Sequence, residues 1–163
     1  MKFLLLIAVG CYTGLRVGDI LLLRWNQLLN KDSQEIKEQK TKKVRLITLN
    51  QNLKKLVEKY VDYIKPPTYN ELIFTNKNDE QNLSIQYVNR QLKKLFNRYK
   101  IKVKNPSSHS LRKTFGLRAF EMNFKSDEAL ITLAHVFNHS STAITRRYIG
   151  LQDEKIENVY LSL

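Results

Sequence analysis

Apolar residues recur at helical spacing along most of this chain. The run over residues 2–12 is followed by Gly14, which favours a buried helix that ends there. Around Trp25, residues 19–29 predict a second helix, or a helix that runs into a strand. Further helices are predicted from Asn50 to Pro66-Pro67, from Ser84 to about Tyr99, and over about 108–123, 126–136, 140–147 and 153–161, with Ser84, Ser126 and Ser140 as N-caps.

One segment follows a different pattern. Ile36 is followed by a polar stretch, residues 37–43, and then by a β-branched and aliphatic run over 44–49. This pattern predicts a small antiparallel sheet with a strongly basic turn. The chain has no internal repeat and no long linker. We therefore expect one domain over residues 1–163, mainly α with a small antiparallel β-sheet (α+β).

The charge balance points to a polyanionic partner. The 163 residues carry 28 Lys+Arg against 15 Asp+Glu, a formal net charge of +13, and the pI is about 9.8. An anionic membrane surface and solvated charge without a partner are the alternatives. Residues 90–104 hold cations and no acid, whereas a solvated helix face ordinarily mixes signs. We expect a phosphate-facing surface made by Arg90, Lys93, Lys94 and Arg98, together with Lys42 and Lys43 of the basic turn.

Several other classes of protein are disfavoured. The apolar run that ends at Cys11 is too short to span a bilayer and has a single charge before it, so we interpret it as a buried helix, not as a signal or lipid-attachment segment. One cysteine excludes an internal disulfide framework. His135 and His139 lie four residues apart, but no carboxylate or thiolate follows at ligand spacing. We therefore expect no metal, no cofactor and no membrane partner.

Four short segments each hold a residue suited to phosphodiester chemistry. They are Thr13–Asp19 with Arg16, the basic turn with Lys40, His109–Arg112, and Phe137–Ser141 with His139. Tyr148 follows His139 by nine residues. Each segment is weak evidence by itself, because a lone arginine or tyrosine is usually structural. If the arginines are only structural, Arg16 and Arg112 are expected to pair with acids such as Asp19 and Glu121.

The order and spacing of these segments resemble the catalytic domain of the tyrosine recombinases, the phage integrase family. Thr13–Arg16 with Asp19 and Trp25 is similar to the family's first box, Ser108–Phe115 to its second, and Phe137–Tyr148 to its third. The resemblance covers about residues 3–160. It implies the family's catalytic-domain fold, double-stranded DNA as partner, and a homo-oligomer, a tetramer, on that DNA. It also implies a cytoplasmic, nucleoid-associated protein of a bacterium, phage or mobile element.

The resemblance also implies a role for each candidate. Tyr148 would attack the scissile phosphorus and form a 3′-phosphotyrosyl link without metal or ATP. Arg16 and Arg112 would clamp the non-bridging oxygens, because guanidinium offers fixed bidentate donors. His139 would add a hydrogen bond to the phosphate, and His109 would act as general base or proton relay. Lys40 would protonate the leaving 5′-oxygen, although Lys42 and Lys43 share its turn. Asp19 is expected to orient an arginine or cap its helix.

Two departures from the family keep other functions open. Phe137-Asn138 stands where the third box usually has Leu-Gly, which we expect to change the packing around His139 more than its chemistry. The family's N-terminal DNA-clamping domain is not expected within these residues. The alternatives are a DNA-binding relic that no longer cuts, and relaxation of supercoils like that of a type IB topoisomerase.

Overall fold

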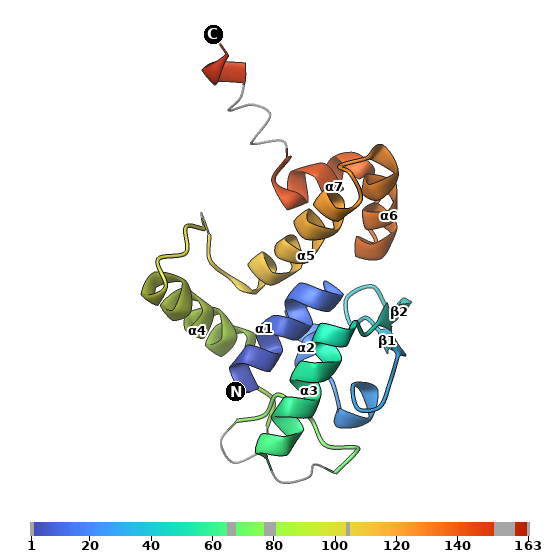
Figure 1. Cartoon of the computed structure of the whole chain (residues 1–163), viewed down its shortest axis with the longest axis vertical. Helices are drawn as coiled ribbons and strands as arrows, with labels where there is room; N and C mark the ends of the chain where they lie inside the picture. The colour runs from blue at the N-terminus through green and yellow to red at the C-terminus, as the bar shows by residue number, and fades with distance from the viewer. Residues whose placement is uncertain (1, 65–67, 77–80, 104, 152–158, 163) are drawn as a thin grey trace. The chain divides into compact units, whose positions relative to one another are not determined.

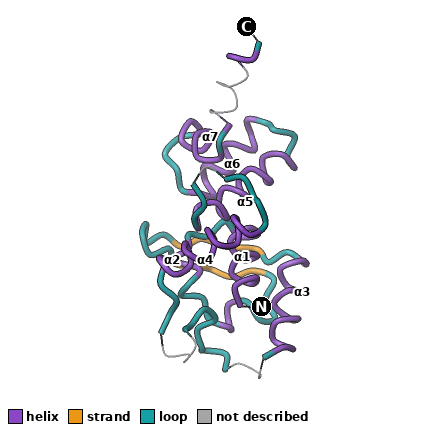
Figure 2. The backbone as a smooth tube through the Cα atoms, turned by 90° about the vertical axis from the view of Figure 1, so that its left-hand side faces the viewer, coloured by secondary structure: helices purple, strands orange, loops and turns teal. Residues whose placement is uncertain are grey.

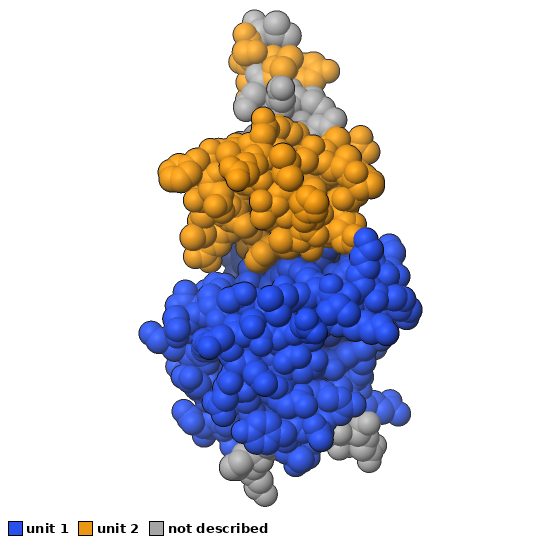
Figure 3. All heavy atoms as spheres, turned by 90° about the vertical axis from the view of Figure 1, so that its right-hand side faces the viewer, with its two compact units in different colours: residues 1–112 blue, residues 113–163 orange. Residues whose placement is uncertain are grey.

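The computed structural model describes residues 2–64, 68–76, 81–103, 105–151 and 159–162. Figure 1 labels the α-helices and the strands; the 3-10 turn η1 completes the set of elements. The elements are α1 (Lys2–Thr13), α2 (Val17–Ile20), a 3-10 turn η1 (Trp25–Gln27), β1 (Ser33–Lys37), β2 (Val44–Thr48), α3 (Gln51–Tyr63), α4 (Ile85–Arg98), α5 (Ser108–Met122), α6 (Asp127–Phe137) and α7 (Thr142–Ile149). The mostly helical fold with one small antiparallel sheet confirms the predicted fold class. The chain divides into two compact units, residues 1–112 and 113–163 (Figure 3).

The core of the first unit forms around α1. Leu6 and Val9 are completely buried, and α1 packs against α3 (Figure 1). Trp25 stacks on Tyr60 of α3 with ring centroids 5.8 Å apart. Gly10 lies against α5, because a Cβ there would come within 2.9 Å of the Leu111 Cβ. The apolar run near the N-terminus is therefore a core helix, as predicted, and none of the described helices is long and apolar enough to cross a membrane.

The predicted sheet is a two-stranded antiparallel hairpin, with the strands in orange in Figure 2. Ser33 pairs with Thr48 at one end and Lys37 with Val44 at the other. Ile36 and Ile47 point into the core of this unit. Residues 38–43 close the hairpin. Alternate residues of a strand point to the same face, so the alternation that buries Ile36 also buries residue 38. This residue is a glutamate, Glu38, and is only 2% exposed.

Side-chain caps begin the helices that flank the hairpin and the basic segment. The Asn50 side chain accepts from the Leu53 N–H at the start of α3, and Ser84 accepts from Tyr87 N at the start of α4. Val88 and Leu92 bury one face of α4. The basic residues of α4 lie on its remaining, exposed surface.

In the second unit, the C-terminal part of α5 forms a small core with α6 and α7. Phe137 is completely buried, and Leu130 and Ile149 are nearly so. Gly116 of α5 has no room for a side chain, because a Cβ would lie 2.7 Å from Ile149 and 2.8 Å from the Phe137 ring. Asn138 ends α6 in the left-handed conformation, with φ 55° and ψ 46°.

Three details differ from the sequence expectation or lie outside the described residues. Residues 19–29 do not form one helix, because Arg24 makes a β-bridge with Leu72 and the backbone there bonds to residues 69–73 instead of continuing α2. Ser141, not Ser140, caps α7 by accepting from the Ile144 N–H. Pro66-Pro67 and most of the helix predicted over 153–161 fall outside the described residues.

Candidate active site

The first box forms a tight turn between α1 and α2. Gly14 adopts a positive φ of 61°, the left-handed region in which glycine carries no Cβ penalty. Its N–H bonds back to the Gly10 carbonyl at 3.1 Å, so the helix ends and the chain reverses. Arg16 follows in an extended conformation as the N-cap residue of α2. Its side chain is 25% exposed, so the turn presents a guanidinium at the surface of this unit.

Two further arginines donate hydrogen bonds to backbone carbonyls of this turn. Arg112 of α5 is 3% exposed and donates to the Gly14 carbonyl. Arg45 of β2 donates to the carbonyls of Thr13 and Gly14. Burial is the largest influence on Arg45 and lowers the pKa of its guanidinium. The first and second boxes are thus joined through the carbonyl of Gly14.

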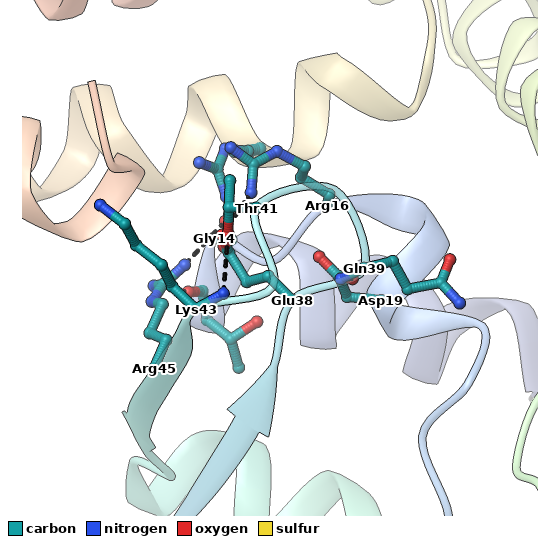
Figure 4. A network of polar contacts seen from close by, with 10 residues as sticks. Gly14, Arg16, Asp19, Glu38, Gln39, Thr41, Lys43 and Arg45 are labelled. Atoms are coloured by element: carbon teal, nitrogen blue, oxygen red, sulfur yellow. Dashed lines mark hydrogen bonds and ion pairs between the residues drawn. The ribbon is translucent and has the colours of Figure 1, made fainter. Parts of the chain in front are cut away.

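Glu38 is the acid that pairs with Arg16. Its Oε2 lies 2.7 Å from Nη1 of Arg16 and accepts a hydrogen bond of 2.8 Å from the Thr41 hydroxyl (Figure 4). Burial alone would raise the pKa of Glu38, but the hydrogen bonds from Thr41 and Arg16 and the charges of Arg16 and Arg112 outweigh it and lower the pKa. Glu38 is therefore held as a carboxylate at the start of the basic turn.

Asp19 makes a second connection to the same turn. It is 4% exposed, and its Oδ1 accepts from the backbone N–H of Gln39 at 2.9 Å. The sequence predicted that Asp19 would orient an arginine or cap a helix. The hydrogen bond goes to the backbone of the hairpin turn, next to Lys40, and the charge of Asp19 also acts to raise the pKa of Arg45.

Four of the predicted residues line one pocket in the first unit. The pocket has a volume of about 350 Å³, and its lining includes Arg16 after the first turn, Lys40 of the hairpin, and His109 and Arg112 from α5. Lys40 and His109 are exposed, whereas Arg112 is buried. Helical spacing places His109 and Arg112 on one side of α5, since residues three apart share a face. The pocket therefore combines two guanidinium groups with an ammonium and an imidazole.

The other two predicted residues meet in the second unit. The rings of His139 and Tyr148 are 5.3 Å apart at their centroids, edge to face. Phe137 packs against both rings, at 5.3 Å and 5.4 Å. Nδ1 of His139 lies 3.0 Å from the hydroxyl of Thr145, which is completely buried. The ammonium of Lys113 lies 5.7 Å from the centre of the Tyr148 ring.

The residues predicted to contact DNA lie at the surface of the first unit. Exposed side chains are found at Lys42, Lys43, Arg90, Lys93, Lys94 and Arg98. Arg90 lies over the Tyr87 ring at 5.5 Å, and Arg98 over Tyr99 at 5.8 Å. These stacked pairs form a basic and aromatic surface on α4, of a kind suited to phosphate and sugar contacts.

Sequence reasoning missed Glu38, Thr145 and Arg45. The strand pattern held a signal for Glu38, because counting in twos from Ile36 buries it. Thr145 gives no signal of its own, and its contact with His139 is visible only once α7 is folded. In the part of the chain that the structure describes, no group of three His, Cys, Asp or Glu side chains is placed to hold a metal ion. His135 is exposed on α6.

Known sequences resemble this chain over most of its length. The model of the phage integrase family matches residues 1–155. The probable integrase/recombinase YoeC of Bacillus subtilis (strain 168) is 30% identical over 151 residues, which cover 93% of this chain and 78% of that protein.

Solved structures show the same fold at lower identity. XerH recombinase bound to palindromic difH substrate in a post-cleavage complex matches 98% of this chain and 44% of its own, with TM-score 0.74 and 21% identity. XerA recombinase matches 99% of this chain and 56% of its own, with TM-score 0.71 and 21% identity. A lambda integrase dimer bound to a COC′ core site matches 91% of this chain and 52% of its own, with TM-score 0.67 and 18% identity. The chain thus spans about half the length of these solved chains. It belongs to the phage integrase family, whose members are tyrosine recombinases that break and rejoin DNA.

Proposed function

We propose that this chain is the catalytic domain of a site-specific DNA recombinase or integrase that cuts and rejoins double-stranded DNA through Tyr148. The observation that carries the proposal is the pocket in the first unit, which gathers Arg16, Lys40, His109 and Arg112 from segments far apart in sequence. The contact between the His139 and Tyr148 rings supports it from the second unit. These six side chains follow the order of the family's boxes.

The two arginines of the pocket bind the scissile phosphate in this proposal. A guanidinium supplies several fixed donors and keeps its charge at every working pH, which suits non-bridging oxygens that stay negative throughout the reaction. Arg16 is held by Glu38, and Arg112 by the Gly14 carbonyl. Such fixed donors need little reorganisation when charge shifts in the transition state.

The proposed chemical step exchanges one phosphodiester for another. Oη of Tyr148 attacks phosphorus as His109 takes the phenolic proton, because a tyrosine of ordinary pKa near 10 is about one part in a thousand ionised at pH 7. The bond from phosphorus to the 5′-oxygen breaks, and Lys40 gives that oxygen a proton. The products are a 3′-phosphotyrosyl link and a 5′-hydroxyl. A 5′-hydroxyl can reverse the step on another strand, so no nucleotide is consumed, and no step of this scheme uses a metal.

His139 acts through its ring orientation. Its Nδ1 contacts Thr145, so we propose that Nε2 is the nitrogen that donates to the phosphate. The packing of Phe137 against His139 and Tyr148 keeps the two rings together.

Strand exchange also sets the partners. Exchange between two duplexes needs several active sites, so we propose a homo-oligomer, a tetramer, on DNA. Because the substrate is chromosomal or mobile-element DNA, we propose that the protein acts in the cytoplasm of a bacterium.

Covalent trapping tests this function. The full chain is mixed with end-labelled, nicked duplexes from the regions that flank its gene, in EDTA, and separated on a denaturing gel. We expect an SDS-stable protein–DNA adduct with the wild type and none with Tyr148→Phe. Tyr63→Phe is the matched control, because Tyr63 is 74% exposed on α3 and has no role in the proposed chemistry; it should form the adduct at the wild-type rate.

Three other outcomes would contradict the proposal. Salt-sensitive DNA binding without an adduct would indicate a DNA-binding relic. An adduct that persists in Tyr148→Phe would mean that another residue is the nucleophile. Adduct formation with relaxation of supercoiled plasmid, but with no joining between two duplexes, would indicate a topoisomerase-like activity.

A further inference from the structure

We propose that Glu38 is a positioning residue that fixes the basic turn, and with it Lys40, relative to Arg16. This inference rests on the proposed function, since it concerns the general acid of that reaction. It assigns a role to a buried side chain that none of the family's boxes contains.

One carboxylate oxygen makes both contacts that matter. Oε2 of Glu38 lies 2.7 Å from Nη1 of Arg16 and accepts from the Thr41 hydroxyl at 2.8 Å (Figure 4). Thr41 is the residue directly after Lys40. The carboxylate therefore ties the guanidinium that would bind the phosphate to the segment that carries the proposed proton donor.

The residue on the other side of Lys40 is fixed as well. The backbone N–H of Gln39 donates to Asp19 of α2 at 2.9 Å. The turn is also closed by backbone bonds of 2.9 Å, from Glu38 N to the Lys43 carbonyl and from Lys42 N to the Glu38 carbonyl. Lys40 is itself exposed, but it stands between Gln39, which is anchored to Asp19, and Thr41, which is anchored to Glu38.

Stability alone does not explain a carboxylate at this position. Glu38 is 2% exposed, and a buried ion pair is often no more stabilising than apolar side chains of similar volume. Its Cα follows β1, where an apolar residue would continue the inward face that begins with Ile36. An acid here instead gives the turn a defined geometry, because hydrogen bonds to a carboxylate are directional whereas apolar packing is not.

The test compares Glu38→Gln with Glu35→Gln in the full chain. Both variants replace an acid by its isosteric amide within the same hairpin, and Glu35 is exposed on β1. We expect Glu38→Gln to slow adduct formation on ordinary nicked DNA on the order of 10- to 100-fold and Glu35→Gln to leave the rate unchanged.

A modified substrate separates positioning of Lys40 from general damage. When the bridging 5′-oxygen is replaced by sulfur, the leaving group is a thiolate, whose conjugate acid has a pKa of about 8.5, so it needs no proton donor. We expect the defect of Glu38→Gln to shrink at least 10-fold on this substrate, in parallel with Lys40→Ala. Tyr148→Phe should stay inactive on both substrates.

Trypsin gives a readout that does not depend on activity. Cleavage after Lys40, Lys42 and Lys43, followed by mass spectrometry, should be faster in Glu38→Gln than in the wild type and Glu35→Gln. Wild-type cleavage rates in Glu38→Gln, or an equal defect on the oxygen and sulfur substrates, would overturn the positioning role while the proposed function stands. A wild type that forms no adduct on either substrate would overturn both.

Discussion

The Thr145 hydroxyl makes a polar contact with the ring of His139. Thr145 is completely buried in α7, and its Oγ1 lies 3.0 Å from Nδ1 of His139 and 3.4 Å from the carbonyl oxygen of Ser141. A hydroxyl between a carbonyl and a ring nitrogen limits both the rotation of the ring and the choice of its protonated nitrogen.

Replacing Thr145 by valine tests this contact. The two side chains are close in volume, so we expect Thr145→Val to slow adduct formation about 10-fold, equivalent to about 1.4 kcal/mol in the barrier, with DNA affinity unchanged. Thr142→Val is the control, because Thr142 is exposed at the first position of the same helix. Single-turnover rates at saturating DNA decide the question, and equal rates in the two variants would remove the role assigned to Thr145.

Asn138 explains how this chain accommodates its departure from the family's third box. The residue ends α6 at φ 55° and ψ 46°, and its N–H bonds to the His135 carbonyl at 3.0 Å. Glycine is the usual residue in this conformation, and asparagine is the next most tolerant. The substitution therefore preserves the backbone turn that leads into His139.

Two substitutions at Asn138 should have opposite effects. Asn138→Gly keeps the left-handed turn accessible, so the free energy of unfolding should stay within about 0.5 kcal/mol of the wild type. Asn138→Ala places a Cβ in that conformation without a compensating side-chain bond, which should cost about 1–2 kcal/mol. Urea denaturation of the full chain measures both values. Alanine tolerated as well as glycine would show that the turn is not strained.

Among the elements, the hairpin turn should show a pH dependence that comes from Glu38. Its pKa in the folded chain is lowered from the usual 4.5, because the bonds from Thr41 and Arg16 outweigh burial. A carboxyl whose pKa is lowered on folding stabilises the protein above its unfolded pKa, and this contribution is lost as the pH falls through the folded value. Folding should therefore weaken below pH 4.5 partly through this residue.

Denaturation of wild type and Glu38→Gln across pH measures that contribution. The difference in free energy of unfolding should be largest near neutral pH and should shrink as the pH falls below 4.5, since the amide does not titrate. Thr41→Val, which removes the hydrogen bond from Thr41 to Oε2 but leaves the ion pair with Arg16, should lie between them. A difference that stays constant across this range would mean that Glu38 is not bound as a carboxylate.

Sequence predicts an element well when the interactions that form it lie within the segment itself. Helix spacing and the caps at Ser84 and Ser126 were sufficient for α4 and α6, because periodicity and N-cap bonds are properties of the segment itself. Of the two alternatives for residues 19–29, a single helix is wrong, because the backbone there bonds to residues 69–73, which the local pattern does not report. Ser140 and Ser141 are equally good caps by type, and only the fold of the turn selects the second.

In the candidate site too, some residues could be predicted from the sequence and others could not. The motifs identified the residues that line the pocket, since their order resembles a known family. They did not identify Glu38 as the partner of Arg16, because that contact joins the hairpin to the first box across the unit. Supporting side chains have no fixed chemical signature, whereas arginine, histidine and tyrosine at family spacing do.

At the scale of the whole molecule, the candidate residues are divided between the two compact units. The first holds Arg16, Lys40, His109 and Arg112, and the second holds His139 and Tyr148. The proposed reaction uses side chains of both units. The binding of DNA should depend on the net charge of +13.

The dependence of DNA binding on positive charge can be assigned to a particular surface of the protein. The exposed cations of α4 lie on one basic face, whereas α3 carries exposed lysines that we do not assign to DNA. The double variant Lys93→Gln/Lys94→Gln should weaken duplex binding and make the log–log salt slope shallower, by about 0.9 for each phosphate that the variant no longer neutralises. Lys55→Gln/Lys59→Gln on α3 removes the same charge and should leave the slope unchanged.

Binding titrations of the full chain over a range of salt concentrations separate the two explanations. If only net charge mattered, the two double variants would be weakened equally in DNA affinity, because each removes two positive charges from the same molecule. If α4 follows the phosphate backbone, only its variant changes the slope, since counterions are released only where a cation meets a phosphate. A slope equal to that of the wild type in both variants would therefore place the DNA on another surface of the protein.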